Sequence, residues 1–175
     1  MTSYRNLIGG VVITLALSLP FYGHTWNLLM HILGAVMFMG NIVVTAVWAS
    51  LARRSRNIEA LRLGVRGISV TDAIFTVPGG LLVLLNGGII GTPYFRAHAT
   101  WLFVSIGLFA ASGIVWGGLL IPVQKRLSAL MRATPGGASI PPEVDSLLGR
   151  WFRWGGIATV LPLIALVLMV FKPTF

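Results

Sequence analysis

The fold is decided by residues 26–56, which read WNLLMHILGAVMFMGNIVVTAVWASLARRSR. From Trp26 to Leu51 the chain contains no Lys, Arg, Asp or Glu, and three arginines follow at once. A helix that crosses the hydrocarbon core of a bilayer needs about 20 mostly apolar residues. We therefore predict that residues 26–51 form a membrane-spanning helix.

Four other stretches have the same character, and together they define the predicted fold class. The chain is expected to be all-α, an integral membrane bundle of about five transmembrane helices in a single domain over residues 1–175. The predicted spans are 7–23, 26–51, 68–91, 98–123 and 154–171, with loops at 52–67 and 124–153 on the cytoplasmic side. Residues 7–23 are interpreted as a retained span rather than a cleaved signal peptide, because a bulky stretch follows the apolar run.

Composition supports the membrane and excludes several other classes. Hydrophobic residues make up 56% of the chain and charged residues only 10%, against about 25% charged residues in soluble domains. The net charge of +9 does not indicate nucleic acid as a partner, because the basic residues lie in short segments between apolar runs. The absence of cysteine excludes disulfides, thiolate metal sites and a cysteine nucleophile.

The distribution of basic residues predicts the orientation. With the N-terminus in the cytoplasm, the inner side collects 11 of the 13 Lys and Arg residues, and the outer side keeps Arg96 and Lys172. Cytoplasmic loops carry such an excess of Lys and Arg. The C-terminus is therefore expected outside. In the inner segment 57–66, Ile58, Leu61 and Val65 follow helical spacing, which is typical of an interfacial helix.

Three spans carry polar residues at helical spacing, and such residues usually face the interior of a bundle. The three stripes are His31, Gly34, Phe38, Asn41, Thr45 and Trp48; Ser69, Asp72, Thr76, Gly79, Val83 and Asn86; and His98, Trp101, Ser105, Leu108, Ser112 and Trp116. We expect these spans to pack their polar faces together, with the first and last spans as apolar supports. Span direction sorts the residues into an outer layer with His31, Asn86, His98 and Trp101, and an inner layer with Trp48, Asp72 and Trp116.

His31 is the first candidate site residue. A buried imidazole can bind haem iron or another transition metal, or relay protons. It can also be a neutral side chain bonded to a neighbouring carbonyl or to Asn86. His98, at the outer edge of another span, is the candidate second haem ligand, and Asn86 and Trp101 would line the same outer site.

Asn41 and Asp72 are the other polar candidates inside the membrane. An intramembrane carboxylate is a functional hypothesis by default. The alternative is that Asp72 is the N-cap of a helix starting at Ala73, with Arg66 near enough to neutralise it. Residues 78–80, Pro-Gly-Gly, are expected to kink or unwind the third span.

Several stretches resemble a family of predicted bacterial integral membrane proteins of unknown function. They are residues 29–41 (LMHILGAVMFMGN), 72–79 (DAIFTVPG), the Trp116 to Pro122 segment and 168–173 (LMVFKP), and the resemblance covers most of 26–173. The helix with His31 is also distantly similar to the first His-bearing helix of copper-resistance CopD-like proteins and of HemJ-type protoporphyrinogen oxidases. The latter resemblance implies haem b and tetrapyrrole oxidation. The lysine that accompanies the histidine in that family has no counterpart within a span, which weighs against the oxidase activity more than against haem binding.

The function predicted from the sequence is that of a protein of the bacterial cytoplasmic membrane that binds haem b for electron transfer or tetrapyrrole chemistry. His31 and His98 would be the haem ligands, no other metal is expected, and no catalytic residue is assigned. The alternatives are a non-enzymatic accessory subunit of a larger membrane complex, and a transporter of ions or small solutes. The expected partners are the lipid bilayer and other membrane subunits.

Overall fold

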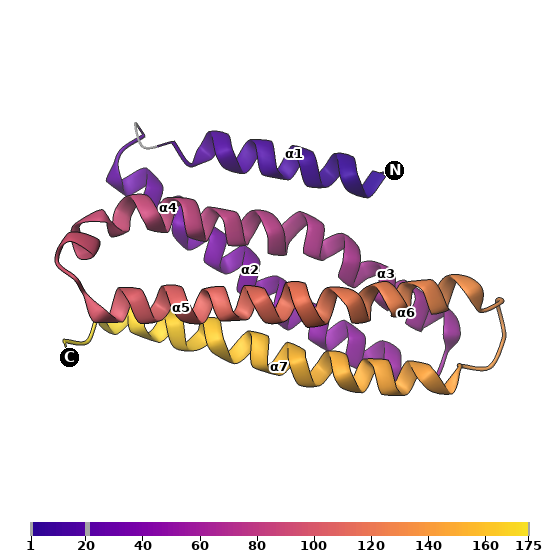
Figure 1. Ribbon diagram of the computed structural model, residues 1–175. Helices are drawn as coiled ribbons and strands as arrows, with labels where there is room; N and C mark the ends of the chain where they lie inside the picture. Colours follow the sequence, from indigo (N-terminus) through magenta and orange to yellow (C-terminus); the bar gives the residue numbers. More distant parts are fainter. Residues whose placement is uncertain (1, 20–21, 175) are drawn as a thin grey trace. The chain divides into compact units, whose positions relative to one another are not determined.

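The computed structural model describes residues 2–19 and 22–174, with side chains from residue 7 onward. All regular structure in these residues is helical. The order is α1 (Thr2–Leu17), α2 (His24–Arg54), α3 (Ile58–Thr71), a π-helical segment η2 (Asp72–Thr76), α4 (Val77–Arg96), α5 (Thr100–Val115), a second π-helical segment η3 (Trp116–Leu120), α6 (Ile121–Ala133) and α7 (Pro142–Phe171) (Figure 1).

Four helical stretches are long and apolar enough to cross a membrane: His24–Arg54, Ile58–Arg96, Thr100–Ala133 and Pro142–Phe171. The predicted all-α integral membrane fold is confirmed at this level. The helices are longer than predicted, since most of the predicted loops 52–67 and 124–153 is helical. The first apolar helix, Leu7–Leu17, is shorter than the predicted span 7–23, of which residues 20 and 21 lie outside the described residues.

Proline explains why two of the long helices contain π-helical turns. η2 ends two residues before Pro78, and η3 ends two residues before Pro122. A proline ring inside a helix clashes with the carbonyl four residues earlier, and a wider π-type turn relieves such a clash. The helix is therefore not unwound at residues 78–80: the turn before them widens, and the helix continues to Arg96, while the predicted kink stays a prediction.

The chain forms two compact units, each described separately below. The first unit consists of Met1–Thr45 and Gly67–Ala97, and the second of Ala46–Arg66 and His98–Phe175. The predicted organisation as a single domain stays a prediction.

In the first unit, α1 runs parallel to α4 (Figure 1). A methyl group built on Gly10 would lie 3.0 Å from the Pro78 ring, and eight residues later along both helices Asn86 Nδ2 donates to Ser18 Oγ at 2.9 Å. The two contacts have the same sequence offset, so the two helices keep one register over two turns. Beyond α1, Trp26 Nε1 donates to the Leu17 carbonyl at 3.0 Å and ties the start of α2 to the end of α1.

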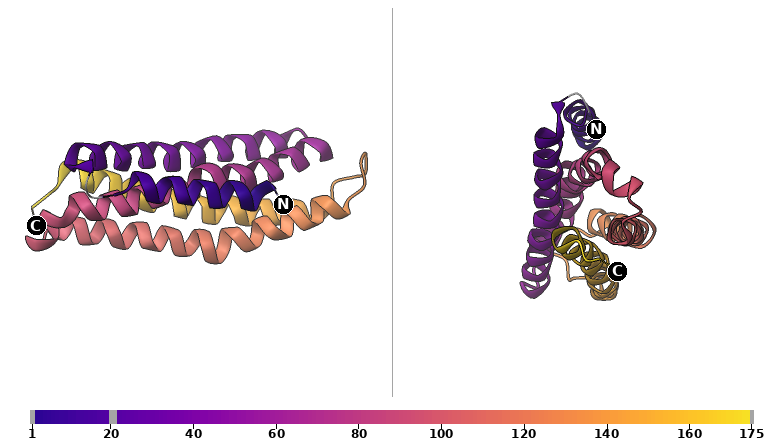
Figure 2. Two further views of the ribbon diagram at one scale, coloured as in Figure 1. Left: turned by 90° about the horizontal axis from the view of Figure 1, so that it is seen from above. Right: turned by 90° about the vertical axis from the view of Figure 1, so that its left-hand side faces the viewer.

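In the second unit, α5 and α7 lie side by side and antiparallel (Figure 2). Ser112 Oγ on α5 donates to the Ala158 carbonyl on α7 at 2.7 Å. The expectation that the last span is only an apolar support is therefore wrong. The Ala158 carbonyl of that span accepts a hydrogen bond from Ser112, which belongs to the third polar stripe. The backbone carbonyl that accepts this bond cannot be read from side-chain patterns.

The second unit also contains the best-buried apolar core of the chain, in a helical cap that we define as residues 46–66, 121–133 and 142–153. Its apolar residues recur mostly at steps of three and four, and the apolar side chains exposed by 6% or less are Ala49, Ile58, Leu61, Val65, Val123, Leu127, Met131, Val144, Leu147 and Leu148. The apolar face of α3 is thus buried against protein, which corrects the prediction of an interfacial helix lying on lipid.

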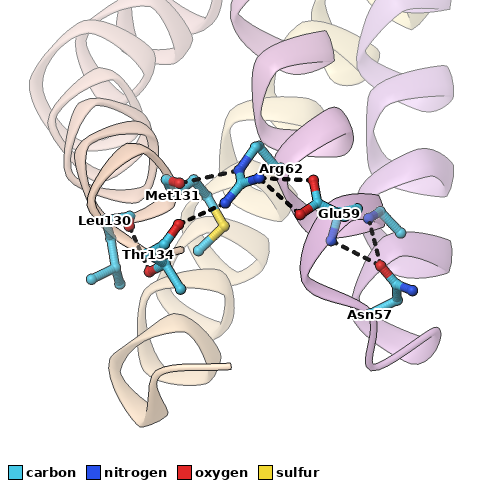
Figure 3. A network of polar contacts seen from close by, with 7 residues as sticks. Asn57, Glu59, Arg62, Leu130, Met131 and Thr134 are labelled. Atoms are coloured by element: carbon cyan, nitrogen blue, oxygen red, sulfur yellow. Dashed lines mark hydrogen bonds and ion pairs between the residues drawn. The ribbon is translucent and has the colours of Figure 1, made fainter. Parts of the chain in front are cut away.

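Arg62 fastens α3 to the end of α6 (Figure 3). Its guanidinium donates to the carbonyl of Met131 at 3.2 Å and to that of Thr134 at 2.7 Å, which are carbonyls that a helix C-terminus leaves unpaired. The same side chain forms an ion pair with Glu59 at 2.8 Å. At the start of α3, Asn57 Oδ1 accepts a hydrogen bond from the backbone N–H of Glu59 at 2.8 Å. Asn57 is thus the N-cap residue of this helix.

The burial of the cap core predicts that truncating a leucine there lowers stability more than truncating an exposed leucine of α7. Leu127 is 1% exposed, and truncating a buried leucine costs about 2–5 kcal/mol. Leu163, on the part of α7 expected to face lipid, is 42% exposed. We expect Leu127→Ala to lower the thermal unfolding temperature in detergent clearly, and the matched Leu163→Ala to change it little. Equal decreases of the unfolding temperature in the two variants would contradict the interpretation that the cap core is stabilised by burial from water.

The cap also holds an acidic side chain between two arginines. Asp145 Oδ1 accepts from Arg53 Nε at 3.1 Å and Asp145 Oδ2 accepts from Arg56 Nη1 at 2.9 Å. The hydrogen bonds from Arg53 and Arg56 lower the pKa of the Asp145 carboxyl below its usual 3.8. A lowered folded-state pKa stabilises the fold above the unfolded-state pKa, and this contribution is lost as pH falls through the folded-state value.

For Asp145→Asn we expect a lower unfolding temperature than wild type at pH 7, because the variant lacks both ion pairs. The difference should close as the pH falls below about 4, where the wild-type carboxyl takes up its proton. The check is a series of melting curves of both proteins across that range. A difference that stays constant with pH would contradict the assignment.

Candidate functional site

The candidate site is built on a close contact between α2 and α4 in the first unit. A methyl group on Gly34 would lie 2.6 Å from Leu82 Cβ and 2.7 Å from the Gly79 carbonyl oxygen. A methyl group on Gly79 would lie 2.9 Å from both the Gly34 carbonyl oxygen and the Phe38 nitrogen. Only glycine fits at either position, and such small residues let membrane helices approach to backbone contact.

His31 lies one turn away from this contact. Its Nδ1 is 2.9 Å from the Val83 carbonyl oxygen. A carbonyl oxygen can only accept, so Nδ1 carries a proton, and in the neutral ring Nε2 then keeps its lone pair. The ring lies against Gly87, where a methyl group would come within 2.9 Å of His31 Nδ1 and Cε1. Backbone atoms of α4 therefore fix both the tautomer and the orientation of the half-buried imidazole.

Asn86 is fully buried one turn further along α4. Its Nδ2 donates to the Leu82 carbonyl at 3.0 Å and to Ser18 Oγ at 2.9 Å. The predicted role of the first span as a purely apolar support is wrong, because Ser18 on that segment completes this contact. Asn86 Oδ1 is buried and has no hydrogen-bond partner among the described residues.

Asn27 shares this property, although the sequence analysis did not select it. It is 0% exposed, its Nδ2 donates to the Gly23 carbonyl at 2.8 Å, and its Oδ1 is buried without a partner in the described part of the chain. The signal available in the sequence was its position one turn before His31. Two buried amide oxygens that lack donors thus belong to the same end of the first unit as His31.

The second polar cluster joins α2 to η2. Asn41 Nδ2 donates to Asp72 Oδ1 at 3.0 Å and to Thr76 Oγ1 at 2.8 Å, and Thr76 Oγ1 donates to Asp72 Oδ1 at 2.9 Å. The N-cap interpretation of Asp72 is wrong, because Asp72 opens η2 inside a helix that is continuous from Ile58 to Arg96. Its carboxylate instead accepts from the Asn41 amide on the opposite helix and from the Thr76 hydroxyl one turn along its own helix.

Three residues assigned to the predicted layers lie in these clusters: His31 and Asn86 near one end of the first unit, and Asp72 in the cluster with Asn41. His31 and Asn41 are about 15 Å apart along α2 at about 1.5 Å per residue. The contact of Gly34 with Gly79 lies between them. Trp48 and Trp116, assigned to the inner layer, belong to the second unit.

His98 and Trp101, the other predicted outer-site residues, also belong to the second unit. His98 is exposed in the turn between α4 and α5, with a left-handed φ of 51°. Trp101 is 7% exposed on α5, and the Lys172 ammonium lies 5.9 Å from its ring centre. The pairing of His31 with His98 therefore stays a prediction.

The glycine contact gives a prediction with an internal control. Gly34→Ala is expected to destabilise the protein by about 1–3 kcal/mol, because its methyl group overlaps Leu82 and the Gly79 carbonyl. Gly40→Ala on the same helix meets nothing within 4 Å and should leave stability unchanged or slightly raised. Melting temperatures in detergent measure both, and equal stability of the two variants would argue against the contact.

Comparison with known proteins matches residues 25–173 to the family described as "Predicted integral membrane protein (DUF2269)". The matched range contains α2 to α7 and begins after α1. Neither the curated proteins nor the solved structures gave a match.

Proposed function

Because the chain belongs to this family of predicted integral membrane proteins, we propose that it binds haem b in the membrane through His31. In this proposal the protein serves electron transfer or tetrapyrrole chemistry. The observation that carries it is the hydrogen bond from His31 Nδ1 to the Val83 carbonyl at 2.9 Å. Histidines that bind metals almost always donate their other ring N–H in this way, which fixes the tautomer and raises the basicity of the ligand.

The donor set of the first unit also favours haem over a bare metal ion. No group of three or more His, Asp or Glu side chains able to hold a metal occurs in the described part of the chain. A single histidine would suit the iron of a haem, because the macrocycle itself supplies most of the ligands to that iron. His98 is the proposed second ligand, and Asn86 and Trp101 would line the same outer site.

Haem b would supply an iron that takes up and releases one electron. The residues of this chain would do the rest. His31 Nε2 offers the ligating lone pair, the Val83 carbonyl holds the imidazole in place, and Gly87 leaves room for the ring. The apolar helices around the site keep water away, which tunes a redox potential.

We propose a five-span topology in the bacterial cytoplasmic membrane, with the N-terminus inside and the C-terminus outside. The parallel register of α1 and α4, from Gly10 and Pro78 to Ser18 and Asn86, supports this. Two parallel neighbours start on the same side, and α4 is preceded by the arginine-rich segment that the positive-inside rule assigns to the cytoplasm. The 16 residues of α1 cover about 24 Å, most of a bilayer core.

A second candidate is a non-enzymatic accessory subunit of a larger membrane complex. The observation in its favour is the inner cluster, in which Asn41 on α2 donates across the helix pair to Asp72 and Thr76. Interhelical hydrogen bonds of this kind are worth about 0.6 kcal/mol on average and serve packing. On this view the polar stripes hold the bundle together and carry no chemistry.

Absorption spectra of the protein purified after haem-supplemented expression decide between the two. Haem binding predicts a Soret band with sharp α and β bands on reduction, lost in His31→Ala and retained in His24→Ala, whose histidine is exposed at the start of α2. Loss of the low-spin bands in His98→Ala with retained haem would identify the second ligand. A colourless wild-type protein would overturn the haem proposal and leave the accessory role.

A further inference from the structure

The charge of the molecule is concentrated in the second unit. That unit holds 11 Lys and Arg residues and three acidic residues, a formal net charge of +8 out of +9 for the chain. All three acidic side chains are already engaged in ion pairs. Asp145 pairs with Arg53 and Arg56, Glu59 with Arg62, and Glu143 with Arg126.

Six basic side chains of the cap are exposed and form no ion pair in the part of the chain that the structure describes. They are Arg54, Arg66, Lys125, Arg132, Arg150 and Arg153. No acidic residue of this unit remains to neutralise them. Their positive potential therefore attracts anions from outside the chain.

The length of α7 would put two of these cations, Arg150 and Arg153, near the depth of lipid headgroups if Phe171 lies at the opposite edge of the hydrocarbon. From Arg153 to the end of α7 at Phe171 the helix covers about 27 Å, close to the thickness of a bilayer core of about 30 Å. The antiparallel register of α7, set by Ser112 with Ala158 and by Arg126 with Glu143, puts Arg153 level with η3. Beyond this level lies the rest of the cap, with its buried apolar core.

The spacing of the two cations suits one ligand. Arg150 and Arg153 are three residues apart on α7, which puts them on neighbouring positions of one helix face. Trp154 follows directly, and indole rings favour the same headgroup level. Guanidinium groups bind phosphate in a planar, bidentate way.

We propose that Arg150 and Arg153 form a binding site for the headgroup phosphate of an anionic phospholipid, such as phosphatidylglycerol. The lipid supplies the negative charge that the cap lacks and holds α7 at a fixed depth in the leaflet at its basic end. The remaining exposed cations of the cap strengthen the field that draws anionic lipid to this site.

The test measures binding of phosphatidylglycerol and of phosphatidylcholine to the full-length protein in mixed micelles, by native mass spectrometry and by thermal stabilisation. We expect selective binding of phosphatidylglycerol that weakens with added salt. Arg150→Gln/Arg153→Gln should weaken it about 30-fold, which corresponds to about 1 kcal/mol for each arginine.

The control is Arg56→Gln/Arg126→Gln, which removes the same charge from arginines already paired with Asp145 and Glu143. Near wild-type binding in this control supports the site, and an equal loss in both variants would overturn it in favour of net charge alone. Equal stabilisation by inorganic phosphate would also overturn it, since it indicates a site for soluble anions. If the first variant fails to fold, equal binding of the two lipids to wild type would still refute the proposal.

Discussion

The first unit depends on the approach of α2 and α4 to backbone contact at Gly34 and Gly79. A methyl group at either position would overlap the opposite helix by several tenths of an ångström. Because the backbones touch, the polar groups on either side come within hydrogen-bond distance. His31 reaches the Val83 carbonyl on one side, and Asn41 reaches Asp72 and Thr76 on the other. Larger residues at the crossing would separate all of these pairs. The geometry of the candidate site therefore depends on glycine at positions 34 and 79.

Two different forces hold the two ends of the long helices. Between membrane helices there is no hydrophobic driving force, because lipid tails are as apolar as leucine, so close packing and hydrogen bonds take over. In the cap, apolar side chains are buried against one another, as burial from water favours for helices outside the hydrocarbon. The apolar side chains exposed by 2% or less in the described residues, Leu127, Met131, Val144 and Leu148, all lie in the cap, while many apolar side chains of the spans are exposed.

Hydropathy and helical spacing were sufficient to predict the long helices, and the stripes of α2 and α4 predicted which faces meet. His31, Asn41, Asp72 and Asn86 all lie in that contact or beside it. The bounds of the helices were missed because span prediction tests apolar content, and the cap helices are amphipathic and charged. The N-cap role of Asp72 failed because a π-helical turn before Pro78 keeps the helix continuous. Partners supplied by the backbone, such as the Val83 and Ala158 carbonyls, leave no trace in side-chain patterns.

The tautomer of His31 is the most direct test of the proposed ligation through this residue. One measurement reports both the contact of α2 with α4 and the availability of Nε2. The chain has three histidines, so nitrogen-15 NMR of histidine-labelled protein in lipid, with His31→Ala to assign the signals, resolves each ring. We predict a protonated, pyrrole-like Nδ1 and a pyridine-like Nε2 for His31 in haem-free protein. A His31 ring protonated at Nε2 alone would contradict the hydrogen bond to Val83, and with it the basis for ligation through Nε2.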